Sequence, residues 1–107
     1  MAVAQRSEVW LVDLGYAAKI RPCLVVSIAP LDADRSLVTI VGHTTSTRGS
    51  QFEVAIEARF LKAGAFDAQN LATIPQVKLI RRLGKLTTEQ MNLVEASLLK
   101  WLGISTN

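Results

Sequence analysis

Short runs of apolar and β-branched residues, each stopped by glycine, proline or a polar stretch, divide most of this chain. The run 8–14 ends at Gly15, and the run 24–28 lies between two prolines. The run 37–41 is continuous and β-branched, which is typical of a strand buried on both faces. Strands are therefore predicted at 8–14, 24–28, 37–41 and 52–56, with weaker candidates at 65–69 and 72–74.

The last segment has a helical period instead. Its apolar residues recur at Met91, Val94, Leu98 and Trp101. Thr87 can act as an N-cap with Gln90 three residues later, and Gly103 supplies a stop. We expect the apolar stripe, Trp101 included, to pack against a core. Many short strands followed by one helix predict a mainly β fold, a small and strongly bent sheet or barrel with a C-terminal helix packed on or beside it.

The length of 107 residues suits one domain spanning 1–107. Apolar runs of four or five residues are far shorter than the roughly 20 that a bilayer span needs, so no membrane segment is expected. The first ten residues are not followed by an apolar stretch of signal-peptide length, which predicts a cytoplasmic protein. A net charge of +3 makes an acidic or nucleic-acid partner more plausible without deciding it. The basic residues around Arg81 read equally well as a solvated loop.

The sequence lacks the residue clusters and motifs that bind metals or cofactors. The chain has one histidine, one cysteine and scattered acidic residues, whereas metal sites need such residues clustered at usable spacing. It also has no P-loop, no Gly-rich dinucleotide motif and no G-x-S-x-G motif. Cys23 lies in an apolar run and is expected to be a small buried group. We therefore expect no metal and no cofactor, which leaves acid/base and electrostatic chemistry.

Arg21 is the first candidate for that chemistry. Pro22 restricts its backbone to extended conformations, and its planar, permanently charged fork suits a phosphate. A surface arginine in an ordinary salt bridge is the alternative reading. A hydroxyl cluster at 44–47 follows the buried run 37–41 and could hold a phosphate or ribose, or could simply cap a turn. His43, the single imidazole, is either a general base or a structural residue.

The order of these segments closely resembles the MazF/PemK family of toxin endoribonucleases. The resemblance rests on the run 8–13, on Arg21-Pro22 leading into 23–27, and on Thr44-Thr45 followed by 52–54. The segments 65–69 and 83–86 are similar as well, so that the match covers about residues 7–102.

The resemblance implies an SH3-like barrel, usually a homodimer, that cleaves single-stranded RNA at short sequences without a metal. In the family's reaction the 2′-hydroxyl attacks the adjacent phosphate and leaves 2′,3′-cyclic phosphate and 5′-hydroxyl ends. A cognate antitoxin covers the same groove with an acidic, partly disordered segment. The family's reactive arginine falls on Arg21 and its reactive threonine on Thr44, with His43 as a candidate base. RNA contacts are expected from Thr45, Ser46, Lys19, Arg48, Gln69 and Arg81.

The sequence also departs from the family pattern. The connection 14–20 is short and lacks an acidic residue, so the cleavage sequence is unreadable. Several members carry an acid immediately before the glutamine that matches Gln69, but this chain has Ala68 there. Asp67 is one step away, and one step along a strand reverses the face.

Two rival functions follow from these features. A topoisomerase-poisoning toxin of the same fold would rely on a tryptophan near the chain end, which makes Trp101 relevant. An inactive antitoxin-binding homologue would explain Ala68.

Overall fold

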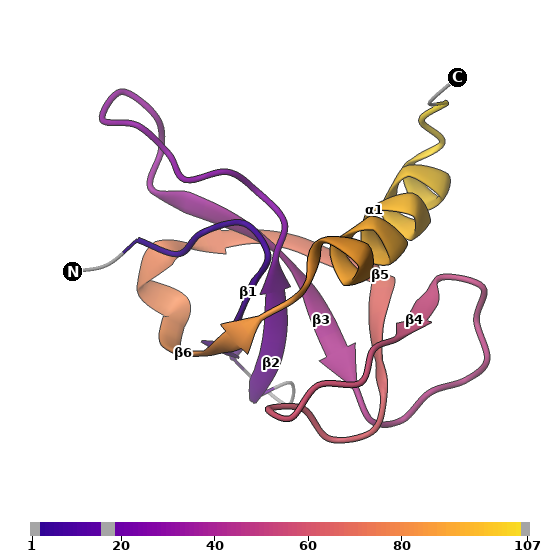
Figure 1. The fold of residues 1–107 in the computed structure, drawn as a ribbon. Coiled ribbons are helices and arrows are strands. Elements are labelled where there is room, and N and C mark those ends of the chain that lie inside the picture. Colours follow the sequence, from indigo (N-terminus) through magenta and orange to yellow (C-terminus); the bar gives the residue numbers. More distant parts are fainter. Residues whose placement is uncertain (1–2, 16–18, 106–107) are drawn as a thin grey trace.

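A computed structural model describes residues 3–15 and 19–105, which form a strongly bent antiparallel sheet with one helix packed against it (Figure 1). The strands are β1 (Glu8–Asp13), β2 (Ile20–Val25), β3 (Leu37–Thr44), β4 (Glu53–Ala55), β5 (Ala65–Pro75) and β6 (Leu79–Lys85). A 3-10 turn, η2 (Gln76–Lys78), joins β5 to β6, and helix α1 (Thr88–Leu102) follows. The strand order across the sheet is β4-β5-β3-β2-β1-β6.

Alternating side chains give the sheet two apolar faces. One face, which we call the helix face, packs against Met91, Val94 and Leu98 of α1. Its fully buried strand residues are Val9, Leu24, Val41, Phe66 and Ala68. The other face, which we call the Thr44 face after the residue at its end, buries Val12, Cys23, Val25, Val38 and Ile40. The two faces therefore have separate cores, and only one of them is covered by the helix.

The ends of α1 are those predicted from the sequence. Thr87 Oγ1 accepts a hydrogen bond from the Gln90 backbone N–H at 3.1 Å, and Gln90 Oε1 accepts one from the Thr87 N–H at 2.9 Å. Gly103 ends the helix in the left-handed conformation, with φ 72°. This reciprocal capping fixes where the chain leaves β6 and enters the helix.

Trp101 is the exception in the helical stripe, and the expectation that it would be buried is wrong. Its side chain is 44% exposed, and its ring meets the edge of Phe52 with 5.3 Å between centroids. The last turns of α1 extend past the sheet (Figure 1), so little of the core is left to cover position 101.

The strands at 8–14, 37–41 and 52–56 are confirmed to within a few residues, and β5 unites the two weaker candidates before ending at Pro75. β2 begins at Ile20, four residues earlier than predicted, because its first residues pair with β1. The ladder between β2 and β3 runs only from Cys23 to Val25, so Pro22 lies outside that ladder and is tolerated in the strand.

β6 was not predicted, because its basic residues read as a solvated loop. It is an edge strand, and Arg81, Arg82 and Lys85 remain exposed on it. Charged side chains are a common protection for such an edge. Among the described residues, no helix is long and apolar enough to cross a membrane.

Candidate active site

Arg21 and Thr44 lie at the same end of neighbouring strands. Cys23 on β2 is paired with Gly42 on β3, and continuing this register by two residues on each strand sets Arg21 opposite Thr44. A step of two keeps both side chains on the face that carries Cys23 and Gly42. Arg21 is exposed and Thr44 is half-buried. The structure therefore brings the two predicted residues together on one accessible surface.

The Thr44 hydroxyl has a defined local role. Its oxygen accepts a hydrogen bond from the backbone N–H of Ser46 at 3.0 Å, which closes the turn after β3. A hydroxyl has one proton to donate as well as an oxygen that accepts. The turn-capping role and a phosphate-binding role are therefore compatible, since the proton remains available to a bound anion.

The loop after β3 is held by Glu53, a residue that the sequence did not single out. The Glu53 carboxylate accepts hydrogen bonds from three consecutive backbone N–H groups. The distances are 3.1 Å from Arg48 to each oxygen, 2.9 Å from Gly49 and 3.1 Å from Ser50. Thr45, Ser46 and Arg48 are exposed on this anchored loop. The sequence signal for this role of Glu53 was an acidic residue at the start of an alternating strand, just after a Gly-Ser turn.

A bulge in β5 faces Gly42. Val41 pairs with Leu71, but His43 pairs with Phe66, so β5 has extra residues between these two points. Asn70 lies in this bulge with its side-chain amide over Gly42, where a Cβ would be only 2.2 Å from Asn70 Nδ2. Gln69 is exposed beside it. Asn70 was also missed, although a glycine inside the β-branched run of β3 indicates a close approach of this kind.

Ala68 and Asp67 point to different faces. Ala68 is fully buried in the core of the helix face, so an acid at this position would point away from Arg21 and Thr44. Asp67 is only half-buried, and its Oδ1 accepts a hydrogen bond from the Gln69 N–H at 3.0 Å. Ala68 therefore does not by itself remove an acid from the Thr44 face.

His43 is not brought to the surface that holds Arg21. Its side chain is 3% exposed on the helix face, with its ring edge-on to Phe66 at 5.0 Å between centroids. Burial lowers the pKa of the imidazole, so the neutral form is favoured, and within the described residues Nε2 has no hydrogen-bond partner. The strand alternation that exposes Thr44 is what turns His43 inward.

Cys23 is buried as expected. Burial raises the pKa of its thiol to about 12, although the nearby charge of Arg21 acts in the other direction. The thiol is therefore neutral and a poor nucleophile. No three His, Cys, Asp or Glu side chains gather as a metal site within the described part of the chain.

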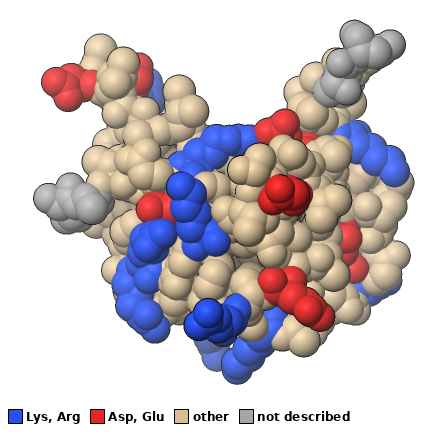
Figure 2. All heavy atoms as spheres, viewed as in Figure 1, with Lys and Arg blue, Asp and Glu red and all other residues tan. Residues whose placement is uncertain are grey.

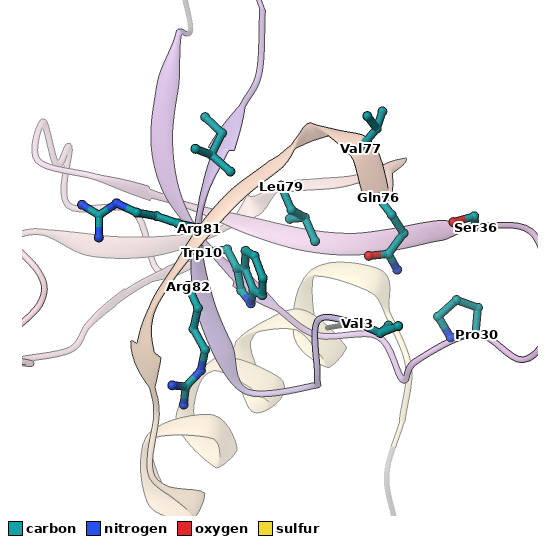
Figure 3. Close-up of a pocket in the computed structure, with 10 residues that line it drawn as sticks. Val3, Trp10, Pro30, Ser36, Gln76, Val77, Leu79, Arg81 and Arg82 are labelled. Carbon is teal, nitrogen blue, oxygen red and sulfur yellow. The ribbon is translucent and has the colours of Figure 1, made fainter. Parts of the chain in front are cut away.

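Arg81 lines a hollow whose lining does not include Arg21. This hollow has a volume of about 600 Å³ and is mostly apolar, with Trp10 and Leu79 at its centre (Figure 3). Its other lining residues are Val3, Pro30, Ser36, Gln76, Val77, Ile80, Arg81 and Arg82. Figure 2 shows basic side chains gathered over the side of the molecule where β6 lies. Lys19, by contrast, is exposed two residues before Arg21.

Glu8 contacts two residues that line that hollow, Trp10 and Arg82. Burial raises the pKa of its carboxyl group, but hydrogen bonds from the Gln5 backbone and the Trp10 indole, with the charge of Arg82, lower it overall. The Trp10 indole N–H donates at 3.1 Å, and Arg82 Nε lies 2.9 Å from the other carboxylate oxygen. Arg82 thus forms an ion pair with Glu8.

Known proteins share the fold and part of the sequence of this chain. Residues 5–102 match the family described as PemK-like, MazF-like toxin of type II toxin-antitoxin system. Endoribonuclease MazF1 of Mycobacterium bovis is 32% identical over 99 residues, covering 92% of each chain. A solved mycobacterial endoribonuclease in complex with its cognate antitoxin has a TM-score of 0.83 and 30% identity, covering 97% of this chain and 99% of that one. A second mycobacterial endoribonuclease has a TM-score of 0.82 and 27% identity, covering 100% and 98%. These matches confirm the resemblance seen in the sequence and the fold it implied: the chain belongs to the PemK-like, MazF-like toxin family.

Proposed function

We propose that this chain is a metal-independent endoribonuclease that cuts single-stranded RNA at short recognised sequences in the cytoplasm. The RNA 2′-hydroxyl would attack the adjacent phosphate and expel the 5′-oxygen, leaving a 2′,3′-cyclic phosphate and a 5′-hydroxyl end. The observation that carries the proposal is the register between β2 and β3, which, extended by two residues from Cys23 and Gly42, aligns Arg21 with Thr44 on one accessible face. Membership of a family whose curated relatives are endoribonucleases supports the same reaction.

Arg21 would bind the reacting phosphate through its planar fork and stabilise the negative charge that grows on it in the transition state. Thr44 would donate its hydroxyl proton to a phosphate oxygen, because its own oxygen already accepts from Ser46. The flanking RNA would contact Lys19, Thr45, Ser46, Arg48 and Gln69, all of which are exposed. Arg81, in the separate hollow, would contribute to partner binding instead.

The direct test is to incubate the purified protein with mixed-sequence RNA in EDTA and to map the new ends. We expect 2′,3′-cyclic phosphate ends that disappear in Arg21→Ala and persist in Arg35→Ala. Arg35 is also an exposed arginine, in the loop between β2 and β3 at the other end of the sheet. Intact RNA would overturn the proposal.

One structural observation keeps a second candidate function in view. Trp101 is 44% exposed near the end of α1, where a topoisomerase-poisoning toxin would present a tryptophan. Inhibited DNA supercoiling with intact RNA, relieved in Trp101→Ala, would favour that function. A protein that binds an antitoxin but shows neither RNA cleavage nor inhibition of supercoiling would be an inactive homologue.

We further propose an acidic antitoxin segment as the protein partner and a homodimer as the working unit. One structural neighbour is solved in complex with its cognate antitoxin, which supports the first part. The apolar hollow of Figure 3, with Arg81 at its rim, suits apolar side chains flanked by carboxylates. Titration with an acidic amphipathic peptide should be weakened by salt and by Arg81→Ala, and sedimentation should give twice the chain mass.

A further inference from the structure

The geometry points to Asp67 as the residue that accepts the proton of the attacking 2′-hydroxyl. This inference rests on the proposed function, and it assigns the one role in that reaction that the sequence left without a residue. Asp67 lies in β5, in the segment that begins the bulge opposite Gly42.

The face of Asp67 follows from its neighbours on β5. Phe66 and Ala68 are both fully buried in the core of the helix face, so Asp67 between them points to the Thr44 face. Ala65 is paired with Thr44, and Asp67 is two residues further along β5. Asp67 is therefore on the same face as Thr44 and diagonal to it across one strand gap.

Arg21 and Asp67 thus flank Thr44 from opposite sides. Arg21 is on β2 and Asp67 on β5, with β3 between them. Neighbouring strands lie roughly 5 Å apart and the two residues are offset by two positions along the strands, so their backbones are separated by about 12 Å. A guanidinium and a carboxylate that reach inward from these positions leave room for one phosphodiester and its ribose between them. Arg21 can hold the phosphate while Asp67 faces the sugar.

The other acids at this end of the sheet are engaged or turned away. Glu53 holds three backbone N–H groups of the loop 48–50. Asp13 follows Val12, whose side chain is on the Thr44 face, so Asp13 points elsewhere, and its Oδ1 accepts from the Gly15 N–H at 2.9 Å. Asp67 uses Oδ1 for the Gln69 N–H, and within the described residues Oδ2 has no hydrogen bond. That bond orients the carboxylate and leaves one oxygen for a proton.

Glu53 on β4 is paired directly with Asp67, and Arg21 lies beyond β3 on the same face. A base must be ionised to act, and it should hold the proton once the 2′-hydroxyl has released it.

The 2′-oxygen forms a bond to phosphorus as its proton passes to Asp67, and the bond from phosphorus to the 5′-oxygen breaks. The leaving 5′-oxygen takes a proton from water, and Asp67 returns its proton to solvent after the cyclic phosphate departs. No oxidant, reductant or further reactant is required.

The test compares Asp67→Asn with the parent protein in single-turnover cleavage of mixed-sequence RNA in EDTA. Asparagine keeps an oxygen for the Gln69 N–H, so the bulge should persist while the base is lost. We expect the rate constant for cleavage to fall about 10²-fold or more, RNA affinity to change less than about 3-fold, and the acidic limb of the pH–rate profile to disappear. Asp32→Asn removes the same charge from the exposed loop between β2 and β3 and should behave like the parent.

The outcomes separate this inference from the proposed function. A parent protein that fails to cleave RNA overturns the function itself. A parent that cleaves, alongside an Asp67→Asn variant with an unchanged rate and an unchanged acidic limb, overturns the role of Asp67 alone. A slower variant that retains the acidic limb makes Asp67 a structural residue of the bulge and also overturns the role. Circular dichroism of Asp67→Asn shows whether the fold is intact, and Asp67→Glu should restore part of the rate and the acidic limb.

Discussion

The side-chain amide of Asn70 lies over the Cα of Gly42, so a Cβ at position 42 would sit 2.2 Å from Asn70 Nδ2. Gly42→Ala should therefore displace the amide. Because Nδ2 is the free end of an exposed side chain, we expect the free energy of unfolding to fall by only about 1 kcal/mol. RNA cleavage should fall more clearly, since Asn70 borders the surface that holds Thr44 and Arg21. Urea unfolding and cleavage rates measured on the same preparations check both parts.

A double-variant comparison identifies the cause of the lost activity. In an Asn70→Ala background the amide is already gone, so Gly42→Ala should reduce cleavage little further. Additive losses from the two substitutions would mean that Gly42 matters for some reason other than its contact with Asn70.

Thr44→Val should lower cleavage at least 10-fold, because valine keeps the shape but offers no proton to a phosphate oxygen. It also leaves the Ser46 N–H without its acceptor, which should cost about 1 kcal/mol of stability. Thr44→Ser retains both hydroxyl functions and should keep most of the rate. End-labelled RNA cleavage under single-turnover conditions distinguishes the two variants. Equal activities for Val and Ser would remove the hydroxyl from the mechanism.

Local patterns predicted the parts of this fold that depend on neighbours in sequence. The capping pair Thr87 and Gln90, the strand at 37–41 and the end at Pro75 all depend on nearby residues, and all were found. β6 was missed because its pairing with β1 is long-range and its exposed charges suit a loop equally well. Trp101 was misplaced because helical periodicity says nothing about where the sheet beneath the helix ends.

The residues of the candidate site also differ in how far local sequence patterns could predict them. Arg21 and Thr44 were selected by their residue types and by the family resemblance, and extending the β2–β3 register by two residues sets them opposite each other. Asn70 and Asp67 depend on a bulge in β5, and a bulge changes which residues share a face without leaving a strong local pattern. Because successive side chains in a strand point to opposite faces, His43 faces the helix when Thr44 faces the other side.

Glu53→Ala should loosen the loop that carries Arg48, because three N–H groups lose one shared acceptor. The loop is largely exposed, so we expect a loss of only about 1 kcal/mol in stability. The larger effect should be a several-fold increase in KM for RNA. Amide hydrogen exchange at residues 48–50 should accelerate, whereas Glu53→Gln, which retains an acceptor oxygen, should show a smaller change. Unchanged exchange at these amides would contradict the anchoring role.

Arg48 and Arg81 should differ in their effect on RNA binding. Each phosphate contact on single-stranded RNA contributes about 0.7 to the slope of log affinity against log salt. Arg48→Ala should reduce that slope by about this amount. Arg81→Ala should leave it unchanged, because Arg81 lines the separate hollow beside Trp10. A matching loss of slope for Arg81 would mean that the RNA extends across β6. Fluorescence anisotropy at several salt concentrations, with a cleavage-resistant 2′-methoxy RNA, gives both slopes.

His43 should make the stability of the protein depend on pH just below neutrality. Burial lowers the imidazole pKa in the folded state from its ordinary 6.5, so between the lowered value and 6.5 the unfolded chain binds more protons than the folded one. The free energy of unfolding must then decrease as the pH falls through this window, by at most about 1.4 kcal/mol per pH unit. His43 is the single histidine of the chain, so no other imidazole contributes.

Carboxylates with lowered pKa, such as Glu8, also destabilise the fold on acidification, but only below their ordinary value of 4.5. Urea unfolding between pH 5 and 7 therefore isolates the histidine. The parent should lose stability across this range, and His43→Leu, which cannot take up a proton, should show a nearly flat profile. If both proteins follow the same pH dependence, the imidazole is not kept neutral by its burial against Phe66.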